Sequence, residues 1–139
     1  MPYSQYLQKS MLDSYFKGAT PTVPTSYSLG LSTGVPNSTS ASELTPGSLN
    51  VTRQNLGTGS AGGAWLAAST VAGSAFVTNN TAVTFASLSA GSFSGCQVWD
   101  TNSTTGGNML VAGGLAAARI TSAGDSLVGA PGAFTVALA

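Results

Sequence analysis

After Pro24, turn-forming residues recur at intervals of roughly eight to twelve positions, so the chain between them has room only for short extended segments. The first segment, residues 26–32, alternates polar and apolar side chains, which is typical of a strand with one buried face. The expected strands cover residues 26–32, 49–56, 76–78, 82–85, 93–99, 109–118 with a continuation to 121, 126–128 and 134–138. This pattern predicts a mainly β fold, either an antiparallel β-sandwich or a jelly-roll-like barrel.

The length of 139 residues matches one typical domain of about 100–150 residues. We therefore expect a single domain over residues 1–139, with a helical part at 1–18 and a β-sandwich at 25–139. Because small residues dominate the sequence, six aromatic side chains are expected to supply much of the buried area: Trp65, Trp99, Phe76, Phe85, Phe93 and Phe134.

The N-terminal segment has a different apolar period, which predicts one helix within residues 3–17. Its apolar stripe recurs at every fourth position, at Tyr3, Leu7, Met11 and Tyr15. Lys17 suits the last turn, where a cation complements the helix dipole, and Gly18 suits the C-terminal cap. Two interpretations of the stripe remain open. It packs against the chain's own sheet, or it contacts a neighbouring subunit through Tyr3, Tyr6 and Tyr15, whose polar tips suit an interface.

Charged residues make up only 6% of the chain, and the net charge is zero. Four cations give no electrostatic grip on nucleic acid, where affinity comes from many Lys and Arg contacts to phosphate. No apolar run of about 18 residues is present, so we expect no contact with a membrane interior. The N-terminus does not resemble a signal peptide. A weakly charged surface favours association, so we expect a protein that works in an assembly.

The residues that carry chemistry are few, and none forms a recognisable catalytic or metal-binding motif. The sequence has no histidine and a single cysteine, which excludes an internal disulfide and a Cys/His zinc site. Asp100 and Asp125 are the one carboxylate pair that folding could bring together, but each neighbours turn residues that explain it better. Cys96 is expected to be a small buried apolar residue. We therefore expect no catalytic residue, no cofactor, no metal and no enzymatic activity.

A long polar loop at 33–48 carries apolar residues at its edges. Val35, Pro36, Leu44 and Leu49 are candidate partner contacts, since prolines lower the entropy cost of ordering such a loop on contact. The alternative is a solvated, mobile loop, and the sequence does not decide between the two.

Several segments, taken in order, resemble a family of small tailed-phage virion structural proteins that are often labelled tail fibre proteins. Residues 3–18 look like the family's short N-terminal helix, and residues 26–33 are similar to its first strand. The strongest match runs from Asn79 to Leu138 and includes Ala82-Val83-Thr84-Phe85, Val98-Trp99-Asp100, Gly106-Gly107-Asn108-Met109-Leu110, Gly113-Gly114-Leu115, Ala123-Gly124-Asp125-Ser126-Leu127 and Phe134-Thr135-Val136-Ala137-Leu138.

This resemblance implies a structural protein of the virion, assembled in the host cytoplasm. The leading hypothesis is a capsid cement or decoration protein on the capsid exterior, which bridges major capsid protein subunits and associates with itself as a trimer. Length favours this hypothesis, because one domain leaves no room for a fibrous repeat. The alternative is a tail fibre or receptor-binding module whose polar loops and Trp65 contact host glycans.

Overall fold

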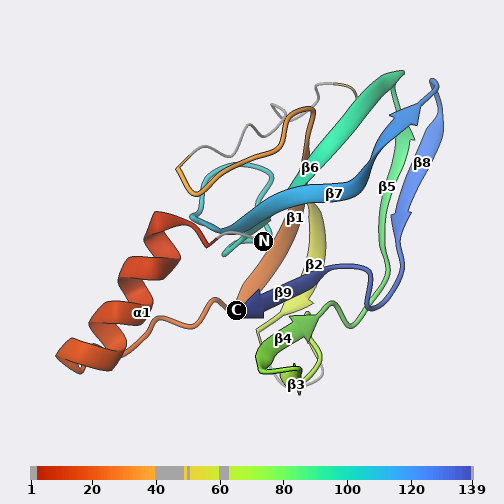
Figure 1. The fold of residues 1–139 in the computed structure, drawn as a ribbon. Helices are drawn as coiled ribbons and strands as arrows, with labels where there is room; N and C mark the ends of the chain where they lie inside the picture. The colour runs from red at the N-terminus through yellow and green to blue at the C-terminus, as the bar shows by residue number, and fades with distance from the viewer. Residues whose placement is uncertain (1–2, 40–48, 50, 60–62, 139) are drawn as a thin grey trace.

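The computed structural model describes residues 3–39, 49, 51–59 and 63–138, and Figure 1 shows their arrangement. They form one helix, α1 (Gln5–Lys17), and the strands β1 (Ser26–Ser32), β2 (Gln54–Thr58), β3 (Ser69–Val71), β4 (Ser74–Thr78), β5 (Val83–Leu88), β6 (Gly91–Trp99), β7 (Met109–Thr121), β8 (Asp125–Gly129) and β9 (Thr135–Leu138). The predicted mainly β class with one N-terminal helix is confirmed. Within this described part, α1 is too short and too polar to cross a membrane.

The strands pair antiparallel in three sheets that together give a sandwich-like body. The largest sheet has the order β2-β1-β6-β7, and the smaller ones are β5-β8 and β3-β4-β9. Figure 1 shows β5 and β8 beside one end of β6 and β7, and the β3-β4-β9 sheet at the opposite end. Helix α1 projects sideways from this body, so much of its surface lies away from the core.

The sequence predicted the positions of most elements but misplaced several boundaries. The helix begins at Gln5 because Tyr3 forms an isolated bridge with Val111, and Ser4 caps the helix. The strand expected at 49–56 lies at 54–58 instead, since Leu49 adopts a left-handed backbone with φ of 50° that extended structure excludes. The short strand β3 was not predicted.

The core lies between the large sheet and the β5-β8 pair. Leu29 and Leu31 from β1, Phe93 and Val98 from β6 and Phe85 from β5 are all at most 1% exposed. The expected aromatic core is therefore only partly correct. Phe85, Phe93 and Phe134 are buried, whereas Trp65, Phe76 and Trp99 are half-buried at its margins.

Strand β7 contains a large bulge that bends it away from its partner. Phe93 of β6 pairs with Arg119 and Gly95 pairs with Gly114, so residues 115–118 of β7 lie opposite Ser94 alone. Figure 1 shows β7 bending along its length towards β8. The bulge bends the strand while both of its ends remain paired with β6.

Asn79 joins the two smaller sheets through a fully satisfied buried amide. Its Nδ2 donates to the carbonyl oxygens of Thr81 at 2.8 Å and Ala130 at 2.9 Å. Its Oδ1 accepts from the Phe134 backbone N–H at 2.8 Å, and the residue is 0% exposed. The turn between β4 and β5 is thereby fixed to the chain between β8 and β9.

We expect Asn79→Ala to lower the free energy of unfolding by about 2–4 kcal/mol, because it removes three hydrogen bonds of a fully buried side chain and leaves their backbone partners unsatisfied. The neighbouring Asn80→Ala is the matched control, since Asn80 is half-buried rather than fully buried. Urea unfolding followed by tryptophan fluorescence measures both variants. Equal losses in the two variants would contradict the central role of Asn79.

Candidate functional site

The helix α1 is well capped and carries a paired set of charges. The Ser4 Oγ accepts from the Leu7 backbone N–H at 3.1 Å, and Gly18 ends the helix in the left-handed conformation, as predicted, with φ of 66°. Lys9 and Lys17 both pair with Asp13, and their hydrogen bonds hold the pKa of that carboxyl below its ordinary value. The helix is therefore ordered by its own local interactions.

Within the described part of the chain, the hydrogen bonds that fasten α1 to the body lie at its first residue and just before it. The Ser4 backbone N–H donates to the Leu110 carbonyl at 2.9 Å, and the Gln5 N–H donates to the Ser38 carbonyl at 3.2 Å. The Tyr3 hydroxyl donates to the Ala137 carbonyl, and burial raises the pKa of Tyr3. No residue of α1 itself is buried. Beyond its first turn, the helix rests on the sheet without entering the core.

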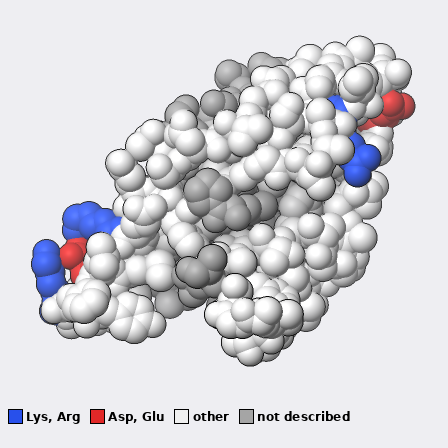
Figure 2. All heavy atoms as spheres, viewed as in Figure 1, with Lys and Arg blue, Asp and Glu red and all other residues white. Residues whose placement is uncertain are grey.

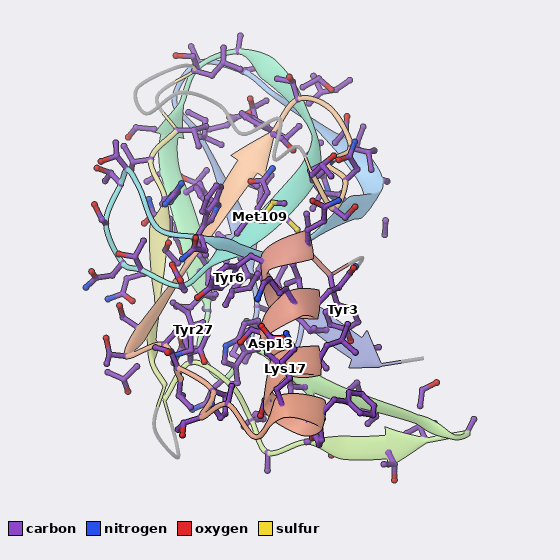
Figure 3. The ribbon with its side chains drawn as sticks, turned by 90° about the vertical axis from the view of Figure 1, so that its left-hand side faces the viewer. Tyr3, Tyr6, Asp13, Lys17, Tyr27 and Met109 are labelled. Atoms are coloured by element: carbon purple, nitrogen blue, oxygen red, sulfur yellow. The ribbon has the colours of Figure 1, made fainter. Side chains whose placement is uncertain are left out.

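Two apolar cavities flank the helix where it crosses the body. The larger one, called here the α1 cavity, has a volume of about 330 Å³, and the smaller one about 160 Å³. The α1 cavity is lined by Tyr6, Leu7, Ser10, Thr22, Pro24, Tyr27, Trp65, Val77, Val98, Leu110, Val111 and Val136. Figure 3 shows Tyr6 and Tyr27 on one side of α1 and Tyr3, which lines the smaller cavity, on the other.

The walls of the α1 cavity are aromatic and uncharged. The rings of Tyr27 and Trp65 meet edge to face, with centroids 6.0 Å apart. Burial raises the pKa of Tyr27, so its hydroxyl stays neutral well above physiological pH. Such walls suit an apolar or aromatic occupant with a few polar groups at its rim.

The side of α1 that faces away from the body presents three large apolar residues to solvent. Leu12 is 58% exposed, Tyr15 is 81% exposed and Phe16 is 83% exposed. Leu12 is three positions from Tyr15 and four from Phe16, so it neighbours both on the helix surface, and we call the three residues together the outer patch. Both interpretations of the helix stripe thus apply in part: Tyr3, Leu7 and Met11 contact the body, whereas Tyr15 faces solvent.

Figure 2 shows one face of the molecule. The charged groups on this face gather at its two ends, over α1 and over the end formed by β7 and β8. Between them, the described residues on this face show no charged side chain. Arg53 contributes nothing to the outer surface, because it is 9% exposed and its guanidinium lies 3.7 Å from the Trp99 ring centroid. Its Nη1 donates to the Gly106 carbonyl at 2.7 Å and so fastens the loop between β6 and β7.

The two carboxylates that the sequence offered as a pair lie at opposite ends of the β6-β7 hairpin. Asp100 follows β6 and accepts from the Asn108 backbone N–H at 2.6 Å. Asp125 accepts from the Ser122 N–H at 2.8 Å, in the turn that follows β7. The nine residues of β6 separate them by roughly 27 Å, whereas paired catalytic carboxylates lie within about 10 Å. Across the described residues, no cluster of three potential metal ligands occurs.

The structure places the remaining predicted contact residues in different environments. Val35 is 66% exposed, whereas Pro36 is buried, with its Cδ 2.4 Å from the position that a Cβ on Gly95 would occupy. Leu49 is half-buried against the core. Leu44 lies outside the described residues, as does most of the loop at 33–48.

Sequence reasoning missed the α1 cavity because its walls come from separate segments of the chain. Tyr27 and Val98 belong to strands whose alternation was recognised, but nothing local indicates that they face a cavity beneath a helix. The outer patch had a visible signal. Leu12 and Phe16 stand four positions apart beside the main stripe, which widens the apolar surface beyond what one contact face needs.

A comparison with protein-family models decides what kind of protein this is. Residues 2–137 match the model described as "Podophage GP4 fiber I protein gp80". The chain belongs to this family. It is therefore a structural protein of a tailed-phage virion, as the sequence resemblance implied. No curated protein matches the chain.

Cys96 provides a test of the core beneath these surfaces. Its thiol is 1% exposed, and burial raises its pKa from about 9 to about 11. We expect the native protein to react with Ellman's reagent at pH 8 far more slowly than the urea-unfolded chain, since the reactive thiolate is scarce and shielded. Rapid stoichiometric labelling of the folded protein would show that β6 is not buried as described.

The same shift gives a pH dependence with a defined sign. A folded pKa above the unfolded pKa means that the thiol stabilises the fold fully below about pH 9, and that this contribution is lost as pH rises towards 11. Cys96→Ala should remove this component of the alkaline loss of stability. Urea titrations at pH 8 and pH 10.5 for both proteins measure the difference.

Proposed function

We propose that this chain is a non-catalytic fibre subunit of the virion, which works by binding neighbouring copies and neighbouring virion proteins through apolar surface. The observation that carries this proposal is the match over residues 2–137 to a family whose description names a fiber protein. The outer patch supports it, since large contiguous apolar surface on a soluble domain marks an interaction site.

The distribution of charge also supports a role in assembly. Asp13 pairs with two lysines, and Arg53 is enclosed by the body, so few charges remain to oppose contact between copies. Binding only to the assembled virion stabilises that assembly by mass action. We extend the proposal to self-association, with a trimer as the expected state.

The second candidate is a capsid cement protein on the capsid exterior, with the major capsid protein as its partner. The observation in its favour is that exposed apolar residues also occur outside α1. Val35, Val71, Ile120 and Val128 are each at least 60% exposed. Apolar contacts on several faces suit a protein that touches several capsid subunits at once.

One version of the fibre hypothesis is that the chain contacts host glycans. Trp65 was the residue expected to stack on a sugar. Its ring meets Tyr27 edge to face and lines the α1 cavity, so a glycan would have to enter that cavity to reach it.

Copy number and position in purified virions distinguish the first two candidates. For a fibre subunit we expect far fewer copies than the major capsid protein, and labelling by a specific antibody at the tail. A copy number comparable to that of the major capsid protein, with label spread over the head, would replace the fibre proposal with the cement proposal. Quantitative mass spectrometry and immunogold electron microscopy supply the two measurements.

A further inference from the structure

Leu12 and Phe16 of the outer patch lie on the side of the helix opposite the α1 cavity, and Tyr15 lies beyond the last residue of the helix that lines the cavity. Tyr6, Leu7 and Ser10 line the cavity, whereas Leu12 and Phe16 belong to the outer patch. At 3.6 residues per turn, the two sets are about half a turn apart. One helix therefore carries an apolar projection on one side and borders an apolar cavity on the other.

We propose that the outer patch of one copy docks into the α1 cavity of a second copy, so that copies join head to tail. This inference deepens the proposed fibre function, on which it rests, by naming the partner and the surfaces that meet. Both surfaces are present on every copy, and no residue has to leave the core for the contact to form.

The volume of the cavity suits the side chains that would enter it. An apolar cavity of about 150 Å³ in another protein holds one benzene molecule. The α1 cavity, with about 330 Å³, therefore has room for about two aromatic rings. Tyr15 and Phe16 are the two most exposed aromatic side chains on α1. Aromatic anchors in well-packed pockets contribute most of the binding energy at protein interfaces.

The chemistry of the two surfaces also matches. No charged residue lines the α1 cavity, so an apolar group can enter without leaving a charge unpaired. Ser10 and Thr22 provide hydroxyls in the cavity wall that can bond the Tyr15 hydroxyl. The charges nearest the outer patch pair with one another in the Lys9-Asp13-Lys17 set, which leaves a charge of only +1 on the helix.

The area of the outer patch determines how strong the contact between two copies is expected to be. Fully exposed aromatic side chains each bury about 150–250 Å², so Tyr15 and Phe16 together offer roughly 300 Å². A standard interface buries about 800 Å² per partner, and smaller ones are weak or transient. The contact is therefore expected to depend on protein concentration in solution and to persist where copies are held side by side, as in a virion.

A head-to-tail contact has a consequence for the assembly. Each copy uses its outer patch on one neighbour and its cavity on another, so copies form a closed ring if the rotation closes and a filament if it does not. A three-membered ring is the closed form that agrees with the expected trimer. Direct pairing of two α1 helices would instead use the same surface twice and stop at a dimer.

Two kinds of variant separate these arrangements. Leu12→Gln combined with Tyr15→Ser and Phe16→Ser removes the outer patch, and Thr22→Phe places a ring where the cavity must receive one. Ser10→Phe is a second cavity-blocking variant, which changes the opposite wall. Ile120→Thr, at a position 85% exposed and far from α1, is the control for lost apolar surface. Thr20→Phe, in the same linker but outside the cavity lining, is the control for an added ring.

We expect wild-type chain and both controls to increase in mass with concentration in size-exclusion chromatography with light scattering, and the patch and cavity variants to stay monomeric. The decisive sample mixes a patch variant with a cavity-blocked variant. The cavity-blocked copy keeps its patch and the patch variant keeps its cavity, so the mixture should form a one-to-one complex that does not grow further. Circular dichroism confirms that each variant is folded.

Three results would overturn the inference: a wild-type chain that stays monomeric at every concentration, a patch variant that associates as the wild type does, or a mixture that stays monomeric although each variant is folded. Association by the cavity-blocked variant alone would likewise overturn the inference and would indicate direct α1–α1 pairing. None of these outcomes bears on where the chain lies in the virion. That question is decided by copy number and labelling, so failure of this inference and failure of the fibre proposal are distinguishable.

Discussion

The architecture depends on one neutral amide, that of Asn79. A chain with so few charged residues cannot join its sheets through ion pairs, and its many small side chains bury little apolar area at the sheet boundaries. Asn79 offers both donors and acceptors in one short side chain, and its backbone adds bonds to Phe134 and Gly132. Buried in this way, with each group paired, the amide specifies one relative placement of the β4-β9 and β5-β8 pairs. Val77 of β4 and Val136 of β9 form part of the wall of the α1 cavity, so the shape of the cavity depends on that placement.

Local patterns in the sequence predicted the features that local physics decides. The alternation at residues 26–32 gave strand β1 its bounds, and Gly18 ended the helix where a left-handed cap was expected. Features that depend on distant segments were not predictable. Nothing near Asn79 in sequence indicates that its side chain reaches residues 130 and 134. The stacking of Arg53 on Trp99 could not be predicted from the sequence, because the two residues meet only after β1, β2 and β6 are aligned.

At the candidate site too, local features were predictable from the sequence and features that depend on distant segments were not. The apolar stripe of α1 and the polar tips of Tyr3, Tyr6 and Tyr15 were visible in the sequence, but their separate roles were not. Tyr3 is fixed to the body by its hydroxyl, Tyr6 borders a cavity and Tyr15 is open to solvent. What separates them is the direction in which the helix leaves the body, which is set by backbone bonds from Ser4 and Gln5 to distant carbonyls. Periodicity identifies a face of a helix, but the angle at which the helix docks decides how far along its length that face is covered.

The bulge in β7 bears on how a weakly charged β protein avoids pairing of its exposed strand edges. Long, flat edge strands recruit further strands and seed aggregation, and neutral chains lack the charges that normally prevent it. Residues 115–118 interrupt the regular spacing of backbone donors and acceptors along the edge of the largest sheet, so a second strand laid against that edge would lose register. A distortion of backbone geometry can in this way replace electrostatic repulsion as the barrier to fibrillar stacking. Association is then directed to side-chain surfaces, where partner choice depends on shape.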